Sequence, residues 1–220
     1  QLQQAADGAR AAYAAGSLPA AIELYGQALN RARVRNGAEE IARNAYNLAI
    51  CWAALNRWAE AQSAIGEARR ECGDDGYLSG QIELVAAKIA WRQGDARGAR
   101  KALELARSEL GSKPPPLLMA QIHLLAGALE CEAGVLDQAR REWAAASTAT
   151  DKSEDPRILA ELDDLDARLL LRAGKPGLAA TVFDREADRL RLLGQHAAMA
   201  DALQAAGDAY EKAGQDAAAA

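Results

Sequence analysis

Four carboxylates within six residues form the densest group of side chains that could do chemistry: Glu161, Asp163, Asp164 and Asp166. Carboxylate oxygens are the ligands that hard cations such as Ca²⁺ take, but a calcium loop brings its ligands to one point. Successive residues of a helix instead point around the cylinder. We therefore expect a solvated helix face, close to a helix N-terminus where negative charge is favourable, and no metal site.

The histidines and cysteines do not form a catalytic or metal-binding pattern either. His123 lies among apolar residues and is expected at the edge of the core or in a groove, and His196 at a helix start. An odd number of cysteines cannot form a closed disulfide framework, so Cys51, Cys72 and Cys131 are expected to be small buried side chains. HExxH, CxxC, GxSxG and GxxxxGK[ST] strings are absent. The sequence predicts no enzymatic activity and no cofactor.

Charge and hydropathy limit the partners. The net charge of −5 provides no general basic surface for nucleic acid. No stretch approaches the ~20 apolar residues of a membrane-spanning helix. Arginine far outnumbers lysine, which is typical of GC-rich bacterial genomes. Because the chain opens at Gln1 without Met, two compartments stay open: the periplasm, as an anchored lipoprotein whose leader has been removed, or the cytoplasm.

The composition predicts an all-α fold. Ala and Leu supply most of the hydrophobic half of the chain, with Glu, Gln and Arg abundant beside them. These residues lose least on entering a helix. Eight Ile, four Val and three Thr are too few to build a sheet of ordinary size.

The chain repeats itself about every 40 residues. A turn residue recurs at intervals of 38 to 40 residues, at Gly16, Asn56, Gly94, Gly134, Gly174 and Gly214. A small residue follows five positions later, at Ala21, Ala61, Ala99, Ala139, Ala179 and Ala219. Another small residue precedes each turn by seven positions, at Ala9, Ala49, Ala87, Gly127, Ala167 and Gly207. A bulky residue follows the first five turns by nine positions, at Tyr25, Ile65, Leu103, Trp143 and Phe183.

This spacing predicts helical hairpins. The small residues allow two helices to cross closely, and the bulky residue fills the gap between neighbouring hairpins. The turn residue ends the first helix in a left-handed conformation. Ser17 and Asp95 are expected to cap the second helices that follow them, and Pro176 to stand in the first turn of another.

At this level the chain resembles the tetratricopeptide repeat family. The resemblance is closest in Asn47-Leu48-Ala49, Trp52, Ala61, Ile65 and Ala68. The family's usual repeat is about 34 residues, so this chain resembles a longer variant. Asp166 and Glu186 depart from the pattern, because they occupy positions that are usually apolar or small. The resemblance implies an α-solenoid, a right-handed superhelix of about five to six helix–turn–helix hairpins.

The repeats divide the whole chain, and we expect a single superhelical domain over residues 1–220. The expected hairpins are approximately 2–36, 38–72, 77–111, 115–150, 155–194 and an incomplete 196–220, which turns at Gly214. Terminal repeats need a polar cap over their exposed apolar face. The last hairpin has none, so a homodimer through this end is one expectation and a missing helix the other.

In a superhelix of this type the first helices line the concave groove, which is where we expect a partner. The candidate partner-binding residues are Arg10, Tyr13, Arg43, Tyr46, Asn47, Lys88, Trp91, Arg92, Gln121, Leu125 and Arg168. Cations beside aromatic rings in the first three repeats favour an extended peptide that is acidic or ends in a carboxylate. The alternative is that Tyr46 and Trp91 only fill space between helices. Ile50 stands where the family's carboxylate clamp has a second Asn, so that clamp is not expected.

The sequence thus predicts a protein–protein interaction scaffold or adaptor that binds a peptide or partner protein, in a bacterial envelope or regulatory complex. The alternative is a sensor or regulatory domain of a larger signalling or transcription protein, which binds a peptide or small ligand. The intact gene would separate the two, since an attached effector domain favours the sensor.

Overall fold

The computed structural model describes residues 2–112, 114–151 and 153–219, and over these residues it is entirely helical, without strands. The all-α prediction is confirmed. The helices group into two compact units, Gln1–Pro114 and Pro115–Ala220. The prediction of one continuous superhelical domain stays a prediction.

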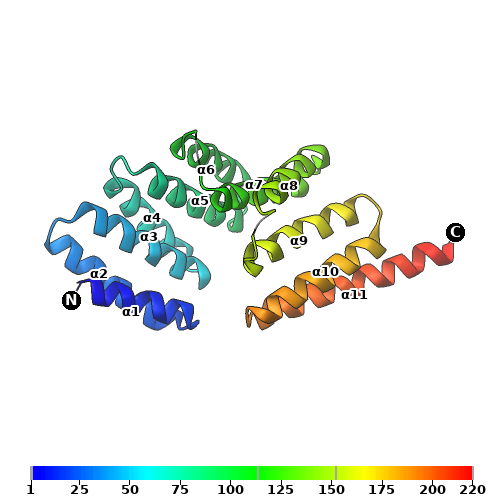
Figure 1. Ribbon diagram of the computed structural model, residues 1–220, viewed down its shortest axis with the longest axis horizontal. Helices are drawn as coiled ribbons and strands as arrows, with labels where there is room; N and C mark the ends of the chain where they lie inside the picture. The colour runs from blue at the N-terminus through cyan, green and yellow to red at the C-terminus, as the bar shows by residue number, and fades with distance from the viewer. Residues whose placement is uncertain (1, 113, 152, 220) are drawn as a thin grey trace. The chain divides into compact units, whose positions relative to one another are not determined.

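The first unit contains six helices of 13 to 17 residues (Figure 1). They are α1 (Leu2–Ala14), α2 (Leu18–Val34), α3 (Ala38–Ala54), α4 (Trp58–Glu71), α5 (Gly76–Arg92) and α6 (Ala96–Glu109). Each odd-numbered helix packs on the helix that follows it, and α2 on α3 and α4 on α5 join the pairs.

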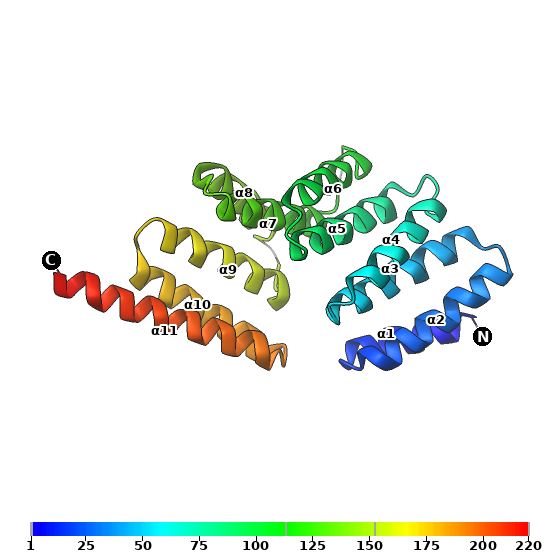
Figure 2. The same cartoon turned by 180° about the vertical axis from the view of Figure 1, so that it is seen from behind.

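The second unit repeats this arrangement, which Figure 2 shows from behind. Its helices are α7 (Pro116–Glu132), α8 (Leu136–Ala149), α9 (Pro156–Arg172), α10 (Pro176–Leu192) and α11 (His196–Ala219). Here α7 packs on α8, α9 on α10, and α10 on α11. Among the described residues, no helix is long and apolar enough to cross a membrane.

Left-handed residues end the first helix of each pair. Gly16, Asn56, Gly94, Gly134 and Gly174 have φ angles between 57° and 79°, as predicted. The predicted turn at Gly214 is wrong, because α11 continues through this residue to Ala219. A glycine lowers helix stability without forbidding a helix.

Helix capping agrees with the prediction at two of three positions. The Asp95 carboxylate accepts a hydrogen bond from the Gly98 backbone N–H at 2.8 Å. Pro176 is the first residue of α10. Ser17 stands at the N-cap of α2, but its side chain makes no capping hydrogen bond, so that prediction is wrong.

Small residues hold the paired helices close together. The aligned alanines at positions 9, 49, 87, 167, 21, 61, 99, 139 and 179 are fully buried. At Gly127 an added Cβ would stand 2.6 Å from the Leu165 side chain, which leaves no room even for alanine. Gly207 is exposed instead, while Ala202, Ala206 and Ala209 of the same helix are buried. The sixth repeat therefore differs from the other five in leaving this position exposed.

The bulky residues of the repeat fill the space beside these crossings. Tyr25, Ile65, Leu103 and Phe183 are buried. Trp143 is half-buried, and its indole N–H donates to the Leu162 carbonyl at 3.2 Å. Tyr25, Ile65 and Phe183 each pack in a cluster with residues of the next hairpin, so the prediction that they plug the gaps between hairpins is confirmed for these three.

Candidate functional site

Three tyrosines from three successive first helices come together in the first unit. Tyr13 of α1 and Tyr77 of α5 have 41% and 52% of their surface exposed, and Tyr46 of α3 is half-buried. Burial, followed by the proximity of Tyr77 and then of Tyr13, raises the pKa of Tyr46 to about 12. We call these three residues the tyrosine row.

Tyr77 was missed by the sequence analysis, although the sequence contains a signal for it. The three tyrosines are 33 and 31 residues apart, which is less than the repeat length of 38 to 40. Each tyrosine therefore lies earlier in its helix than the one before. Tyr13 lies near the end of α1, Tyr46 in the middle of α3 and Tyr77 at the start of α5. The row crosses the three helices diagonally.

The predicted groove cations of α1 and α3 already have carboxylate partners. Arg10 pairs with Asp7 one turn earlier. Arg43 binds Glu39 at 2.9 Å and reaches Asp75, the residue that caps α5, at 3.6 Å. Both arginines are exposed, so these contacts are individually weak. A ligand carboxylate would have to replace an existing partner rather than meet an unpaired charge.

The remaining candidates of the first unit lie toward the other end of α5. The Arg92 guanidinium stacks over the Trp91 ring, 5.2 Å from its centroid. Trp91 follows Tyr77 by fourteen residues, about 21 Å along the helix. Lys88 and Asn47 are half-buried. The predicted candidates thus separate into the tyrosine row and a tryptophan–arginine stack distant from Tyr77.

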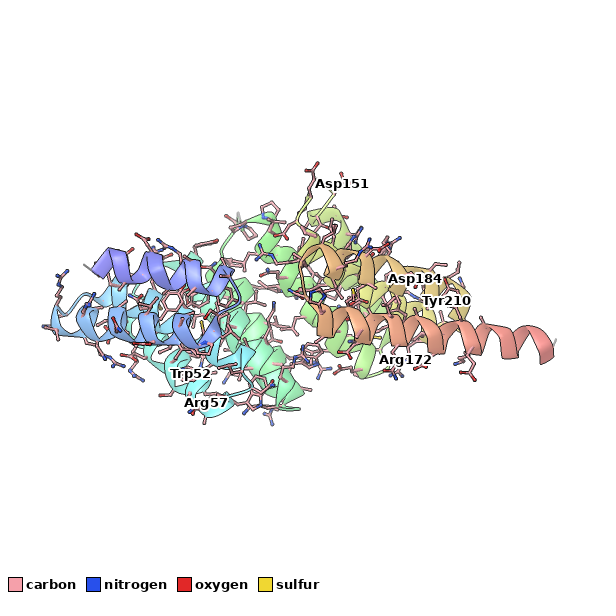
Figure 3. The ribbon with its side chains drawn as sticks, turned by 90° about the horizontal axis from the view of Figure 1, so that it is seen from below. Trp52, Arg57, Asp151, Arg172, Asp184 and Tyr210 are labelled. Carbon is pink, nitrogen blue, oxygen red and sulfur yellow. The ribbon has the colours of Figure 1, made fainter. Side chains whose placement is uncertain are left out.

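A second stack of this kind, which the sequence analysis missed, lies at the turn within the preceding pair. The Arg57 guanidinium lies 4.3 Å from the centroid of the Trp52 ring, across the turn between α3 and α4 (Figure 3). Cation–π contacts at exposed positions contribute about 0.5–1 kcal/mol. We interpret this contact as one that stabilises the turn between α3 and α4.

The candidates of the second unit have different surroundings. Leu125 is buried in the core and offers no binding surface, while Gln121 is half-buried. Arg168 binds Asp164 at 2.8 Å and approaches Glu132 at 3.9 Å. Like Arg10 and Arg43, it already has carboxylate partners.

A cavity of about 380 Å³ opens between α9 and α11 in this unit. It is lined by Leu171, Arg172, Ala205, Asp208, Ala209 and Lys212. The lining includes three apolar residues, two cations and one carboxylate; Arg172 is labelled in Figure 3. Such a cavity has the size and chemistry to accept one or two residues of a peptide.

The acidic cluster is not a solvated face at Asp163, so that prediction is wrong. Asp163 is 3% exposed and accepts hydrogen bonds from Arg185, at 2.5 and 3.0 Å, and from Arg189. Arg189 also donates to the Leu159 carbonyl at 2.6 Å. The carboxylate therefore ties α9 to α10. Among the described residues, no group of three or more His, Cys, Asp or Glu could hold a metal ion.

Glu186 of α10 lies beside this network. Its pKa is raised to about 8, chiefly by burial and also by the nearby Asp164 and Asp163, while Arg168 acts in the opposite direction. The burial follows from the repeat, because this position is normally small or apolar. The carboxyl is thus mostly protonated near pH 7 and gains its charge as the pH rises through about 8.

The Glu186→Gln variant should change how stability depends on pH. Since the pKa rises from 4.5 unfolded to about 8 folded, the folded chain binds the proton more tightly, and wild-type stability falls as pH rises between these values. Glutamine has no proton to lose. Urea midpoints should match near about pH 5 and favour the variant near about pH 9. Glu161→Gln, at an exposed position of α9, is the control, and an effect of Glu186→Gln that is equal at both pH values would contradict the assignment.

The histidines and cysteines have structural positions. His123 Nδ1 lies 2.6 Å from Glu142 Oε2 and joins α7 to α8 at the core edge, as expected. His196 is the first residue of α11, also as expected. Cys51 and Cys131 are buried, and Cys72 is half-buried after the end of α4. All three thiols are free.

These features define the class of the protein as an all-α chain of repeated helix pairs with an aromatic row on its first helices. No protein-family model matches the sequence, and no curated protein matches it at a significant level.

Proposed function

We propose that this chain is a non-enzymatic interaction scaffold whose first helices bind an extended peptide, or an extended segment of a partner protein, across the tyrosine row. The carrying observation is that Tyr46 interacts electrostatically with Tyr13 and Tyr77, which come from the neighbouring helix pairs, and that these two tyrosines are about half exposed. Tyrosine is enriched among the residues that dominate binding energy, because its ring buries apolar area and its hydroxyl forms hydrogen bonds.

In this proposal the chain is a tetratricopeptide-like solenoid with a long repeat. The turn residues with positive φ, the buried small residues and the 38- to 40-residue spacing support it. The pairs form a right-handed superhelix in which α1, α3 and α5 line the concave wall. The tyrosine row then crosses the groove diagonally, which suits an extended chain that contacts several repeats.

The partner's chemistry follows from the charges beside the row. Arg10 and Arg43 already contact Asp7, Glu39 and Asp75. The binding energy therefore comes mainly from apolar and aromatic contact, and the arginines set orientation at the rim. The acidity of the bound peptide therefore contributes less to binding than the sequence alone suggested.

The tyrosine row can be tested with a phage-displayed library of random linear peptides panned on the purified chain. We expect selected peptides to bind the Tyr13→Ala/Tyr77→Ala double variant at least about 30-fold more weakly, since hot-spot residues contribute about 2 kcal/mol or more each. Fluorescence anisotropy with the labelled peptide measures this. Both tyrosines are substantially exposed, so the variant should keep its helical circular dichroism.

The matched control is Leu105→Ala, a residue of similar exposure on the second helix α6 of the same unit. It should bind the peptide like the wild type. Arg43→Glu with Arg92→Glu forms a separate arm, and a large loss there would show that the ligand is acidic. Unchanged binding by the tyrosine variant would reject the row as the binding surface.

A further inference from the structure

The last helix has a bare apolar face. α11 packs on α10 through Ala202, Ala206 and Ala209, and Figure 1 shows the two helices side by side. Next to this contact runs a line of four apolar or small residues at spacings of four, three and four: Leu203, Gly207, Tyr210 and Gly214. We call this line the α11 stripe. Leu203 is 48% exposed and Tyr210 47%.

The earlier helix pairs show what kind of element covers this position. Gly207 aligns with Gly127 and Ala167. A Cβ added at Gly127 would meet Leu165 of α9 as well as Glu142 and Ala139 of α8, and Ala167 packs in one cluster with Ala179 and Phe183 of α10. In both cases the second helix of the pair supplies part of the cover. Within the described chain nothing lies within 4 Å of a Cβ added at Gly207 or Gly214, so α11 lacks this cover.

The stripe is complementary to itself in an antiparallel arrangement. Its spacing reads the same in both directions, and its large and small residues exchange places on reversal. When two stripes cross about a two-fold axis between positions 208 and 209, Leu203 meets Gly214 and Tyr210 meets Gly207 of the second copy. Every bulky side chain then faces a glycine, which allows the helices to approach closely. A two-fold interface requires this self-complementarity.

The polarity of the α11 stripe also favours a second copy of the chain as its partner. None of the four residues of the stripe is charged, so two copies bring no like charges into contact along it. The Tyr210 hydroxyl donates to Asp184 of α10 at 2.7 Å, and both residues are labelled in Figure 3. This bond satisfies the hydroxyl and leaves the ring to pack against the partner.

From these observations we infer that a second copy of this chain covers the α11 stripe, so that two α11 helices pair antiparallel in a homodimer. The inference does not depend on the proposed peptide site, which lies in the other unit. Each dimer would present two tyrosine rows, and a bivalent partner would bind more tightly than a monovalent one.

Sedimentation equilibrium of the chain over a range of concentrations tests the inference. The wild type should form a reversible dimer, and Gly207→Glu should weaken it by at least about tenfold, because the carboxylate would face an aromatic ring in an apolar contact. Nothing obstructs a side chain at Gly207, so the variant monomer should fold. Gln204→Glu adds the same charge at an exposed position beside the stripe and should dimerise like the wild type.

Cysteine cross-linking tests the orientation. A mixture of Leu203→Cys and Gly214→Cys chains should form a mixed disulfide dimer on oxidation, whereas Leu203→Cys alone should not. The wild type, oxidised in parallel, accounts for its own three thiols. A wild type that stays monomeric, a dimer unaffected by Gly207→Glu, or cross-links between two Leu203→Cys chains would each overturn the proposed pairing.

Discussion

Replacing Asp163 by alanine should lower the free energy of unfolding of the second unit by about 3–5 kcal/mol. The carboxylate is almost fully buried and accepts hydrogen bonds from two guanidinium groups, those of Arg185 and Arg189. Its removal takes the shared partner away from both cations at the α9–α10 interface, although Asp166 stays near Arg185. Breaking a buried ion pair by deleting one partner is costly for this reason. Urea denaturation followed by circular dichroism measures the loss.

The control for Asp163 is an ion pair on the surface of the same unit. Asp188 pairs with Arg191 at 3.0 Å, but its side chain is mostly exposed. Asp188→Ala should cost no more than about 1 kcal/mol. If the two substitutions had equal effects, Asp163 would not be the joint between α9 and α10.

Replacing Phe183 by alanine should destabilise the second unit by a similar amount, about 3–5 kcal/mol. Phe183 is buried in a cluster that contains Ala167 of α9 and Ala206 and Ala209 of α11. Its neighbours are mostly alanines, which cannot move far enough to fill the space that the ring leaves. The cavity should weaken the attachment of α11 to α10, which thermal unfolding and hydrogen exchange of α11 would both detect.

Leu178→Ala provides the comparison for Phe183, because Leu178 is on the same helix but 56% exposed. We expect a change within about 0.5 kcal/mol. A Phe183 effect of that small size would mean that the cluster collapses around the missing ring, and that the bulky position of the repeat does not fix the spacing of the pairs.

The helix pairs could be predicted because their determinants are local. Gly16, Asn56 and Gly94 end helices through their own backbone conformation. Asp95 caps α6 by accepting a hydrogen bond from a backbone N–H only three residues later. Local rules also explain the error at Gly214. Glycine permits a turn, but a turn forms only where a second helix packs back on the first, and the sequence alone does not show whether that packing occurs.

Much of the candidate site depends on contacts that the sequence does not show. The partners of Asp163 lie 22 and 26 residues away on another helix, so its burial could not be inferred from its acidic neighbours. Tyr46 was predicted from the repeat, but its neighbour Tyr77 required the relative shift of α3 and α5. Leu125 has the helical phase of a groove residue, and the packing of the second unit buries it.

The free thiols give the protein an internal pair of reporters. Burial raises the pKa of Cys51 to about 11 and also raises that of Cys131, so neither reacts readily in the folded chain. Cys51 belongs to the first unit and Cys131 to the second. Alkylation of each thiol therefore requires its own unit to open. Mass spectrometry of the two labelled peptides over time would measure the opening of each unit separately, in one sample and without an engineered probe.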